Sequence, residues 1–301
     1  MIEIEVGSNL FEGAATLSWH GMFSFIAVAT AVVLVGRWAV LRGIDPDDIY
    51  AIAVWAIIGG VIGARLVHVV DNWTDLYSQS PGQIIAIWNG GIGLWGGIIG
   101  GFIGGSLYSL RFGHPIGVIA DLTVPALLFV QSIGRLGDIV NGEHCTRAAN
   151  YFLGFEWLSP DATARAACRD HYPGIGSADY GGAPLFAMQP VILFEIVWNM
   201  AALVLIWKLR GKLKPDGMLF ALYLALYAMG RFGIQFLRTD GVWALGMQEA
   251  HYIALLVLIA TVPLLIAKAR FGPTPALEAA SAPVPRGSRA ERHRRQRRNK
   301  C

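Results

Sequence analysis

Residues 17–40 read LSWHGMFSFIAVATAVVLVGRWAV, and this stretch decides the class of fold. It is 24 residues long, and Arg37 is its only Lys, Arg, Asp or Glu. An α-helix rises about 1.5 Å per residue, so about 20 mostly apolar residues cross the hydrocarbon core of a bilayer. The stretch therefore predicts a membrane-spanning helix.

Six further stretches resemble the first in their length and apolar character. Together they give seven candidate spans, at residues 17–40, 49–70, 84–110, 117–133, 190–209, 217–234 and 252–267. The fourth is short and contains Asp121, so it has the weakest support. The sequence predicts an all-α integral membrane protein with seven transmembrane helices.

The composition of the whole chain agrees with a membrane protein. Hydrophobic residues make up 54% of it and charged residues only 15%, whereas soluble domains carry about 25% charged residues. The 36 glycines have no collagen-like period, and glycine is more frequent in transmembrane than in soluble helices. This composition argues against an ordinary cytosolic enzyme and, for most of the chain, against intrinsic disorder.

Positive charge is concentrated at the C-terminal end. Residues 283–301 contain eight Lys or Arg and one acid, Glu291, so this segment carries +7. The whole chain carries +3, so the preceding residues carry −4. The basic character therefore belongs to a tail and does not indicate a nucleic-acid partner. We expect a membrane domain over residues 1–270, with an outer loop at 140–187, and a disordered basic cytoplasmic tail over 271–301.

Lys and Arg near the ends of the spans predict the orientation, because such residues are enriched on the cytoplasmic side. Four sets lie at or just after the ends of spans one, three, five and seven: Arg37 and Arg42; Arg111; Lys208, Arg210, Lys212 and Lys214; and Lys268 and Arg270. Seven spans put all four sets on one side, so the N-terminus is expected outside and the C-terminus in the cytoplasm. No cleavable signal peptide is visible, because residues 1–13 are acidic and no small-residue cleavage site follows an apolar core.

The chain has three cysteines, Cys145, Cys168 and Cys301, which are too few for a disulfide scaffold. Cys145 and Cys168 lie in the predicted outer loop, and the space outside the membrane permits disulfides. A disulfide bridge between these two cysteines and a pair of free thiols are the two alternative interpretations.

Two rows of glycines at intervals of four residues run along the third span. They are Gly93, Gly97, Gly101 and Gly105, and Gly96, Gly100 and Gly104. Rows of small residues let transmembrane helices approach closely, so tight helix packing is the favoured interpretation. Close approach of a lipid at Asn89-Gly90-Gly91 is the alternative.

Ionisable side chains lie within or at the ends of several spans, although each costs about 2.5–3.5 kcal/mol at a helix centre. The predicted topology puts most of them toward the outer side: His20, Arg65, His68, Arg135, Glu143, Glu195, Arg231 and Arg238. Several arginines in one leaflet predict a clamp for an anionic group, because the guanidinium fork matches phosphate. Pairing for structure, or snorkelling to the interface, is the alternative.

The densest polar stretch is residues 133–143, which read IGRLGDIVNGE. We interpret it as a glycine-rich turn at the membrane surface that presents Arg135, Asn141 and the carboxylates Asp138 and Glu143. This set suits a phospholipid headgroup and a proton acceptor. A glycine-rich turn that caps a helix has a similar sequence.

At these residues the chain resembles the bacterial prolipoprotein diacylglyceryl transferases. The family signature G-R-x-G-N-F-x-N-x-E stands here as residues 134–143. Five more segments resemble the family in order: Ser18-Trp19-His20-Gly21, Gly63-Ala64-Arg65-Leu66, Trp88-Asn89-Gly90-Gly91 through Gly96-Gly97, Gln189-Pro190 through Phe194-Glu195, and Tyr227 through Asp240. The likeness covers most of residues 17–265.

The resemblance implies that the protein transfers a diacylglyceryl group from phosphatidylglycerol to the lipobox cysteine thiol of a preprolipoprotein. Glycerol phosphate leaves, and this is the first step of lipoprotein maturation. The resemblance also implies a multi-pass protein of the bacterial plasma (inner) membrane that needs no metal or other cofactor. Its expected partners are phosphatidylglycerol, lipobox-containing preprolipoproteins and the lipid bilayer, with no nucleic acid.

The resemblance further implies roles for particular residues. Arg135 and Arg231 would hold the phosphate and stabilise its developing charge. Asn141 and Glu143 would orient the headgroup, and Tyr227 would donate a hydrogen bond. The expected catalytic residues are Arg135, Arg231, Glu143 and His20, and the expected substrate-binding residues are Arg135, Asp138, Asn141, Tyr227, Arg238, Trp95 and Arg65.

The chain departs from the family pattern at several of these positions. Trp95 stands where the family has a histidine, His20 replaces a tyrosine, Asp138 replaces the signature asparagine, and Gln235 replaces a glutamate. A thiol, with a pKa of about 8.5, must lose its proton to attack, and an indole cannot accept it. Glu143, His144 and His20 are the alternative bases.

Two other functions remain open at the level of sequence. A relative that keeps the phospholipid site but has another acceptor or chemistry would explain retained arginines beside a lost histidine. A non-enzymatic lipid-binding or scaffold protein of the membrane is the third interpretation.

Overall fold

The computed structural model describes residues 2–7, 9–11, 17–86, 93–142, 145–149, 151–158 and 187–272. The chain forms two compact units. Unit one comprises Met1–Val35 and Ser109–Thr274, and unit two comprises Gly36–Tyr108 and Pro275–Cys301.

Within the described residues, six helices are long and apolar enough to cross a membrane. They are α1 (Trp19–Val40), α2 (Pro46–Asp71), α4 (Ile116–Asn141), α6 (Val191–Leu209), α7 (Met218–Gln235) and α8 (Glu249–Lys268). A seventh helix, α3 (Leu94–Phe112), has 19 residues and is not one of these six. The predicted class, an all-α membrane protein, is confirmed.

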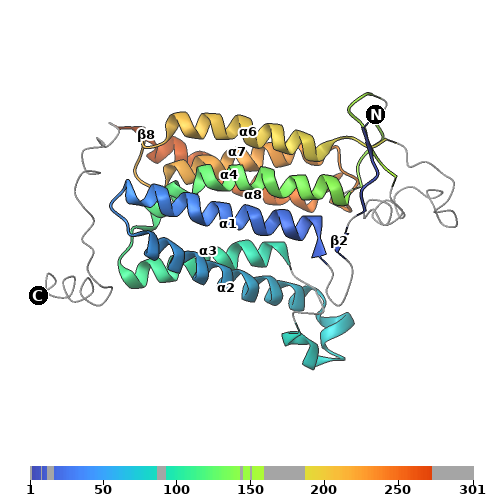
Figure 1. Ribbon diagram of the computed structural model, residues 1–301, viewed down its shortest axis with the longest axis horizontal. Helices are drawn as coiled ribbons and strands as arrows, with labels where there is room; N and C mark the ends of the chain where they lie inside the picture. Colours follow the sequence, from blue (N-terminus) through green and yellow to red (C-terminus); the bar gives the residue numbers. More distant parts are fainter. Residues whose placement is uncertain are drawn as a thin grey trace, which may run out of the picture. The chain divides into compact units, whose positions relative to one another are not determined.

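Unit one is organised around α4, α6 and α7, which pack against one another, and α8, which packs against α7 (Figure 1). Its core contains Val124 and Leu128 of α4, Ile206 of α6, and Leu219 and Tyr223 of α7. These side chains are buried because each helix turns one apolar face toward its neighbours. The rest of the apolar surface of the helices remains exposed, as expected for segments that contact lipid.

Short strand pairs join the ends of the helices in unit one. Strand β1 (Ile2–Ile4) pairs in parallel with β4 (Phe155–Trp157), and β2 (Asn9–Phe11) pairs antiparallel with β3 (Leu17–Ser18). Antiparallel pairs also join β5 (Leu213–Lys214) to β8 (Arg270–Phe271), and β6 (Val242–Ala244) to β7 (Met247–Gln248).

Asp121, the acid that weakened the fourth predicted span, caps another helix. Its Oδ2 accepts a hydrogen bond from the backbone N–H of Gly217 at 2.9 Å, and its Oδ1 accepts one from Phe220 at 2.9 Å. These N–H groups lie at the start of α7, where a helix has no partners of its own for its first donors. The presence of a carboxylate in the membrane-spanning helix α4 is therefore explained by its hydrogen bonds to the start of α7.

The predicted end of the fourth span, residue 133, and the turn predicted at 133–143 are wrong. Helix α4 continues through Gly134 and Gly137 to Asn141 and ends at Gly142. Gly142 has φ 62°, a left-handed conformation, and its N–H bonds to the carbonyl of Asp138 at 2.9 Å. Glycine tolerates a helix interior as well as its end, so the hydrophobic pattern could not show which glycine stops the helix.

The predicted start of the third span, residue 84, is also wrong. Residues Pro81–Ile85 form a separate short 3₁₀ helix, η2, which follows the π-helical turn η1 (Trp73–Tyr77), and α3 begins at Leu94. The guanidinium of Arg65 binds the backbone carbonyls of residues 83, 84 and 86, so these carbonyls are not part of a long helix. Both η1 and η2 belong to unit two.

The glycines of α3 allow close contact with α2, as predicted. A Cβ built on Gly100 would lie 2.2 Å from the carbonyl oxygen of Gly59, and one on Gly96 would lie 2.0 Å from that of Gly63. In the other row, a Cβ on Gly97 would meet Ala64 Cβ at an ordinary 3.6 Å. The row of Gly96 and Gly100 therefore makes the closer contact with the backbone of α2. The alternative site at Asn89-Gly90-Gly91 lies outside the described residues.

Two predictions, one about the outer loop and one about the tail, fall only partly on residues that the structure describes. Cys145 is disulfide-bonded, while Cys168, the partner considered from the sequence, lies outside the described residues. Phe271 pairs with Leu213 in the β5–β8 pair. The rest of the predicted tail, from residue 273 onward, lies outside the described residues.

We expect Gly100→Ala to destabilise the protein and Gly97→Ala to leave it unchanged or slightly more stable. Both changes gain about 0.5–1 kcal/mol of helix propensity. Only the methyl group at position 100 collides with backbone, and such overpacking costs about 1–3 kcal/mol. Thermal unfolding of the purified protein in detergent measures the difference. Equal melting temperatures for the two variants would contradict the close contact of α2 and α3.

Candidate functional site

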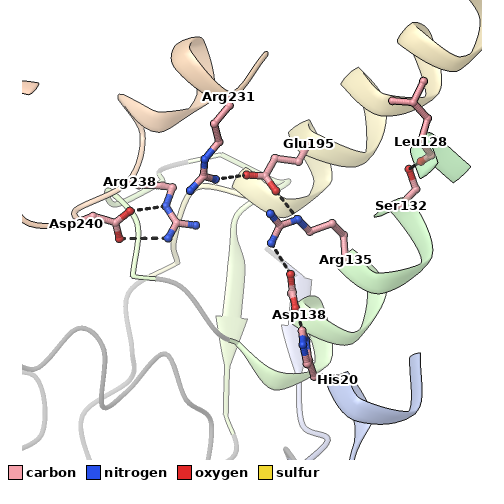
Figure 2. A network of polar contacts seen from close by, with 9 residues as sticks. All are labelled: His20, Leu128, Ser132, Arg135, Asp138, Glu195, Arg231, Arg238 and Asp240. Atoms are coloured by element: carbon pink, nitrogen blue, oxygen red, sulfur yellow. Dashed lines mark hydrogen bonds and ion pairs between the residues drawn. The ribbon is translucent and has the colours of Figure 1, made fainter. Parts of the chain in front are cut away.

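Five charged or ionisable side chains from four helices form one continuous chain in unit one (Figure 2). His20 Nδ1 lies 2.6 Å from Asp138 Oδ1, and Arg135 Nη1 lies 2.5 Å from Asp138 Oδ2. Arg135 Nε lies 2.6 Å from Glu195 Oε2, and Arg231 Nη1 lies 2.8 Å from Glu195 Oε1. We call these five residues the charged network.

The network gathers at one end of the helices of unit one. His20 is the second residue of α1, and Glu195 lies in the second turn of α6. Arg135 and Asp138 lie near the end of α4, three residues apart, a spacing that puts their side chains on one face of the helix. Arg231 lies four residues before the end of α7. Two helices therefore begin and two end at the same place (Figure 1).

Gly137 lets α1 approach α4 closely enough for the first ion pair. A Cβ on Gly137 would lie 2.8 Å from the Cα of His20 and 3.3 Å from its backbone nitrogen. Gly134, three residues earlier on α4, has nothing within 4 Å of its Cβ position. The short contact at Gly137 thus positions the imidazole of His20 beside Asp138.

Burial differs between the two signs of charge in the network. The side chains of Asp138 and Glu195 are only 4% and 9% exposed. Those of Arg135, Arg231 and His20 are 24%, 22% and 42% exposed. Buried carboxylates are tolerated when cations pair with them. The cationic groups are therefore the part of the network that can meet a ligand, and an anion suits them.

A second polar cluster follows directly after α7. Arg238 donates to Asp240 from Nε at 2.8 Å and from Nη2 at 3.2 Å, a two-point contact. Gln235 Nε2 donates to Asp240 Oδ2 at 2.7 Å and also to the side chain of Gln248. Gln248 Nε2 in turn donates to the carbonyl of Arg238 at 3.0 Å. The segment after α7 is therefore fixed by side-chain contacts.

Asp240 lies in this connecting segment, beyond the end of α7. Burial alone would raise the pKa of its carboxyl group. The hydrogen bond and the charge of Arg238 act against burial, and the net result is a lowered pKa for Asp240. The carboxylate consequently stays ionised at neutral pH and holds Arg238.

Three arginines of the predicted clamp, Arg135, Arg231 and Arg238, lie close to one another in unit one. Arg231 interacts electrostatically with Arg135, Arg238 and Tyr227. Tyr227 lies one helical turn before Arg231 on α7 and stacks at a tilt on Tyr223, with ring centroids 6.2 Å apart. Asn141 is buried in the last turn of α4. Seven of the predicted site residues, the signature Asp138 and His20 among them, thus belong to this one unit.

Other predicted site residues lie elsewhere or outside the description. Arg65 belongs to unit two, where it donates to the carbonyl oxygens of Ile84 at 2.8 Å and Ala86 at 3.2 Å and lies 5.4 Å from the Tyr77 ring centroid. These contacts hold the segment before α3. Trp95 is in α3, but its side chain is not described, and Glu143 and His144 lie outside the described residues.

Glu195 is the residue that sequence reasoning left out of the site. Two signals for it were available: it is an ionisable residue in a span, and it ends a segment that resembles the family. Its function as a bridge depends on Arg135 and Arg231, which are 60 and 36 residues away along the chain. Such a contact between three helices has no pattern in the sequence.

Comparison with known proteins gives a consistent result. The sequence model of one family, described as prolipoprotein diacylglyceryl transferase, matches residues 9–267. A phosphatidylglycerol–prolipoprotein diacylglyceryl transferase of Rhodococcus jostii is 31% identical over 254 residues, which cover 83% of this chain and 70% of the relative. Those of Dehalococcoides mccartyi and Frankia alni are 33% and 35% identical, and the matches cover 90% and 76% of this chain and 96% and 56% of the relatives.

We expect Gly137→Ala to lower the melting temperature of the protein, whereas Gly134→Ala should not. The added methyl group at position 137 pushes against the backbone of His20, and the one at position 134 enters open space. Loss of the close approach also separates His20 from Asp138, which leaves a buried carboxylate with one partner fewer. Thermal unfolding in detergent compares these two variants of the same helix. A stable Gly137→Ala protein would show that α1 does not need this contact.

Proposed function

The chain belongs to the prolipoprotein diacylglyceryl transferase family, and we propose that the charged network is the site at which it acts. The protein is a transferase that moves a diacylglyceryl group from phosphatidylglycerol to a prolipoprotein. The observation that supports the site is the continuous contact from His20 to Arg231 across four helices. It joins the family signature on α4 to the arginine of α7.

The proposed arrangement in the membrane has seven spans, with α3 as the seventh. Basic residues lie in the last turns of α6 and α8, at Lys208 and Lys268, which is the end opposite to the network. Because basic residues are enriched on the cytoplasmic side, the network faces the outer leaflet of the plasma membrane. The disulfide of Cys145, in the loop after α4, supports an outer position, since disulfides persist outside the cytosol.

Arg231 is the proposed direct ligand of the lipid phosphate. Among the described residues its guanidinium contacts one carboxylate, Glu195, through Nη1. The rest of the fork can donate to phosphate oxygens, which accept such paired contacts well. Arg135 contacts carboxylates through both Nε and Nη1, so it holds Glu195 and Asp138 in place and adds its charge. Arg238, Asn141 and Tyr227 are the proposed contacts of the headgroup.

The reaction explains why fixed cations are needed. The sulfur of the lipobox cysteine attacks the glycerol carbon next to the phosphate ester oxygen, and a carbon–sulfur bond forms. The carbon–oxygen bond breaks, and glycerol phosphate leaves with the bonding electrons. Negative charge grows on the leaving oxygen, and preorganised donors at that point lower the barrier. Arg231 and Arg135 are held in advance by Glu195 and need little rearrangement.

The two other interpretations of the sequence are less well supported. The family model covers nearly the whole helical part of the chain, and relatives from distant bacteria have the same named activity. The proposed acceptor therefore remains a preprolipoprotein with a lipobox cysteine.

We expect Arg231→Ala to reduce transfer 10²- to 10³-fold, which is the usual cost of removing one donor that stabilises a developing oxyanion. Arg231→Lys should recover little, because a point charge does not reproduce the fork. The assay follows labelled phosphatidylglycerol onto a lipobox peptide. Lys212→Ala, a change at an exposed site, is the control and should keep full activity. Near-normal turnover of Arg231→Ala would exclude it as the phosphate ligand.

We also expect the C-terminus to be cytoplasmic and the β6–β7 hairpin to be outside. Cys301 should react with a membrane-impermeant maleimide only after the cells are permeabilised. A cysteine placed at Leu245, whose side chain is 90% exposed, should react in intact cells when Cys301 is replaced by alanine. Labelling of Cys301 in intact cells would reverse the orientation and put the network on the cytoplasmic side.

A further inference from the structure

The contact between His20 and Asp138 has a defined chemical form. An ionised carboxylate can only accept hydrogen bonds, so the proton of a neutral imidazole must lie on the nitrogen that faces it. That nitrogen is Nδ1, 2.6 Å from Asp138 Oδ1. The other nitrogen, Nε2, then carries a lone pair and can accept a proton. The pair fixes the tautomer that a general base requires.

Asp138 is itself held in the ionised state and in position. Arg135 donates to its second oxygen, Oδ2, at 2.5 Å, and the carboxylate is buried in α4. The remaining charged groups of the described network are Glu195 on α6 and Arg231 on α7. The carboxylate therefore cannot turn away from the imidazole without losing its cation.

The imidazole is accessible although its partner is buried. The His20 side chain is 42% exposed, while that of Asp138 is 4% exposed. Nε2 lies 3.4 Å from the hydroxyl oxygen of Ser24, one turn further along α1, which is a long contact for a hydrogen bond. A substrate group can thus reach the ring from the side away from Asp138.

The proposed reaction needs such a group. A thiol attacks as the thiolate, and Trp95 offers an indole that takes up no proton. We propose that His20 is the base that takes the proton of the acceptor cysteine, with Asp138 as the residue that positions it. The inference rests on the proposed function and assigns one step of it.

The step balances without an oxidant, reductant or metal. The thiol proton passes to Nε2 of His20 and gives an imidazolium. The sulfur electron pair forms the bond to the glycerol carbon, and the electron pair of the carbon–oxygen bond leaves with glycerol phosphate. The imidazolium then returns its proton to the departing phosphate oxygen or to water, and His20 is neutral again.

The test is the pH dependence of transfer to a lipobox peptide by His20→Gln and by the wild type. At pH 7 the variant should lose activity 10²- to 10⁴-fold, the usual contribution of a general base. Its rate should rise about tenfold per pH unit up to the pKa of the free thiol, about 8.5, because the thiolate then forms without a base. The wild type should show no such rise. A purely structural defect would lower the rate equally at every pH.

Asp138→Asn tests the positioning residue in the same assay. The amide oxygen can still accept from Nδ1, so this variant keeps the contact and removes the charge. It should lose activity at pH 7 and recover part of it at pH 9. Its cost when added to His20→Gln should be smaller than its cost in the wild type, because the part of its effect that acts through His20 is then already lost. The cost that remains reflects the lost charge beside Arg135. Should His20→Gln fail to fold, this variant still tests the pair by its pH profile. Lys212→Ala is the matched control, with an unchanged profile.

The outcomes distinguish a failure of the assigned base from a failure of the proposed function. Wild-type activity of His20→Gln at pH 7 overturns the assignment of the base and leaves the transferase function standing, and Glu143→Gln and His144→Gln then identify the base. Full additivity of the two changes overturns the role of Asp138. A wild-type protein that binds labelled phosphatidylglycerol vesicles but never modifies the peptide overturns the proposed function, and the assignment of the base with it.

Discussion

The guanidinium of Arg135 lies between two buried carboxylates, and the arrangement of the site depends on this contact. Through Asp138 it reaches α1, and through Glu195 it reaches α6 and then α7. Loss of one partner of a buried ion pair costs about 3–5 kcal/mol, because the other charge is left without compensation. Well-packed apolar residues of similar volume would often be as stable. Stability alone therefore does not account for this network, whereas the proposed phosphate site requires cations that are fixed in this way.

Glycines provide the second condition, because charged groups can meet only where the helix backbones come close. Within a membrane, lipid chains are as apolar as leucine, so helices associate through close packing rather than through exclusion from water. Gly137 permits the approach of α1 to α4 in unit one. In unit two, Gly59 and Gly63 of α2 meet Gly100 and Gly96 of α3 in the same way. Small residues thus bring helices together in both units, and in unit one the close approach also joins charged side chains.

Hydropathy was sufficient to predict the class of fold and the middle of each helix. It failed at two helix ends for physical reasons. Gly134 and Gly137 fit inside a helix, so α4 continues beyond the predicted end. Before α3, the backbone carbonyls of Ile84 and Ala86 accept hydrogen bonds from Arg65 and are not part of a long helix. For the site, the alternating direction of the seven predicted spans predicted that the arginines lie toward the same side of the membrane. It could not predict that Glu195 joins two of them, because that contact depends on the rotation of three helices about their axes.

The charges of the network also explain how the proposed base and the phosphate site can act together. With His20 neutral, the charges of two arginines and two carboxylates cancel among the five described members of the network. The network therefore attracts an anion because its cations are more exposed than its carboxylates, and not because it carries a net positive charge. Transfer of the thiol proton to His20 makes the network positive by one. In the proposed step this charge appears on His20 of α1 while negative charge develops on the leaving phosphate that Arg231 and Arg135 hold. The proton therefore changes the network from neutral to cationic at the stage of the reaction where a cation is most stabilising.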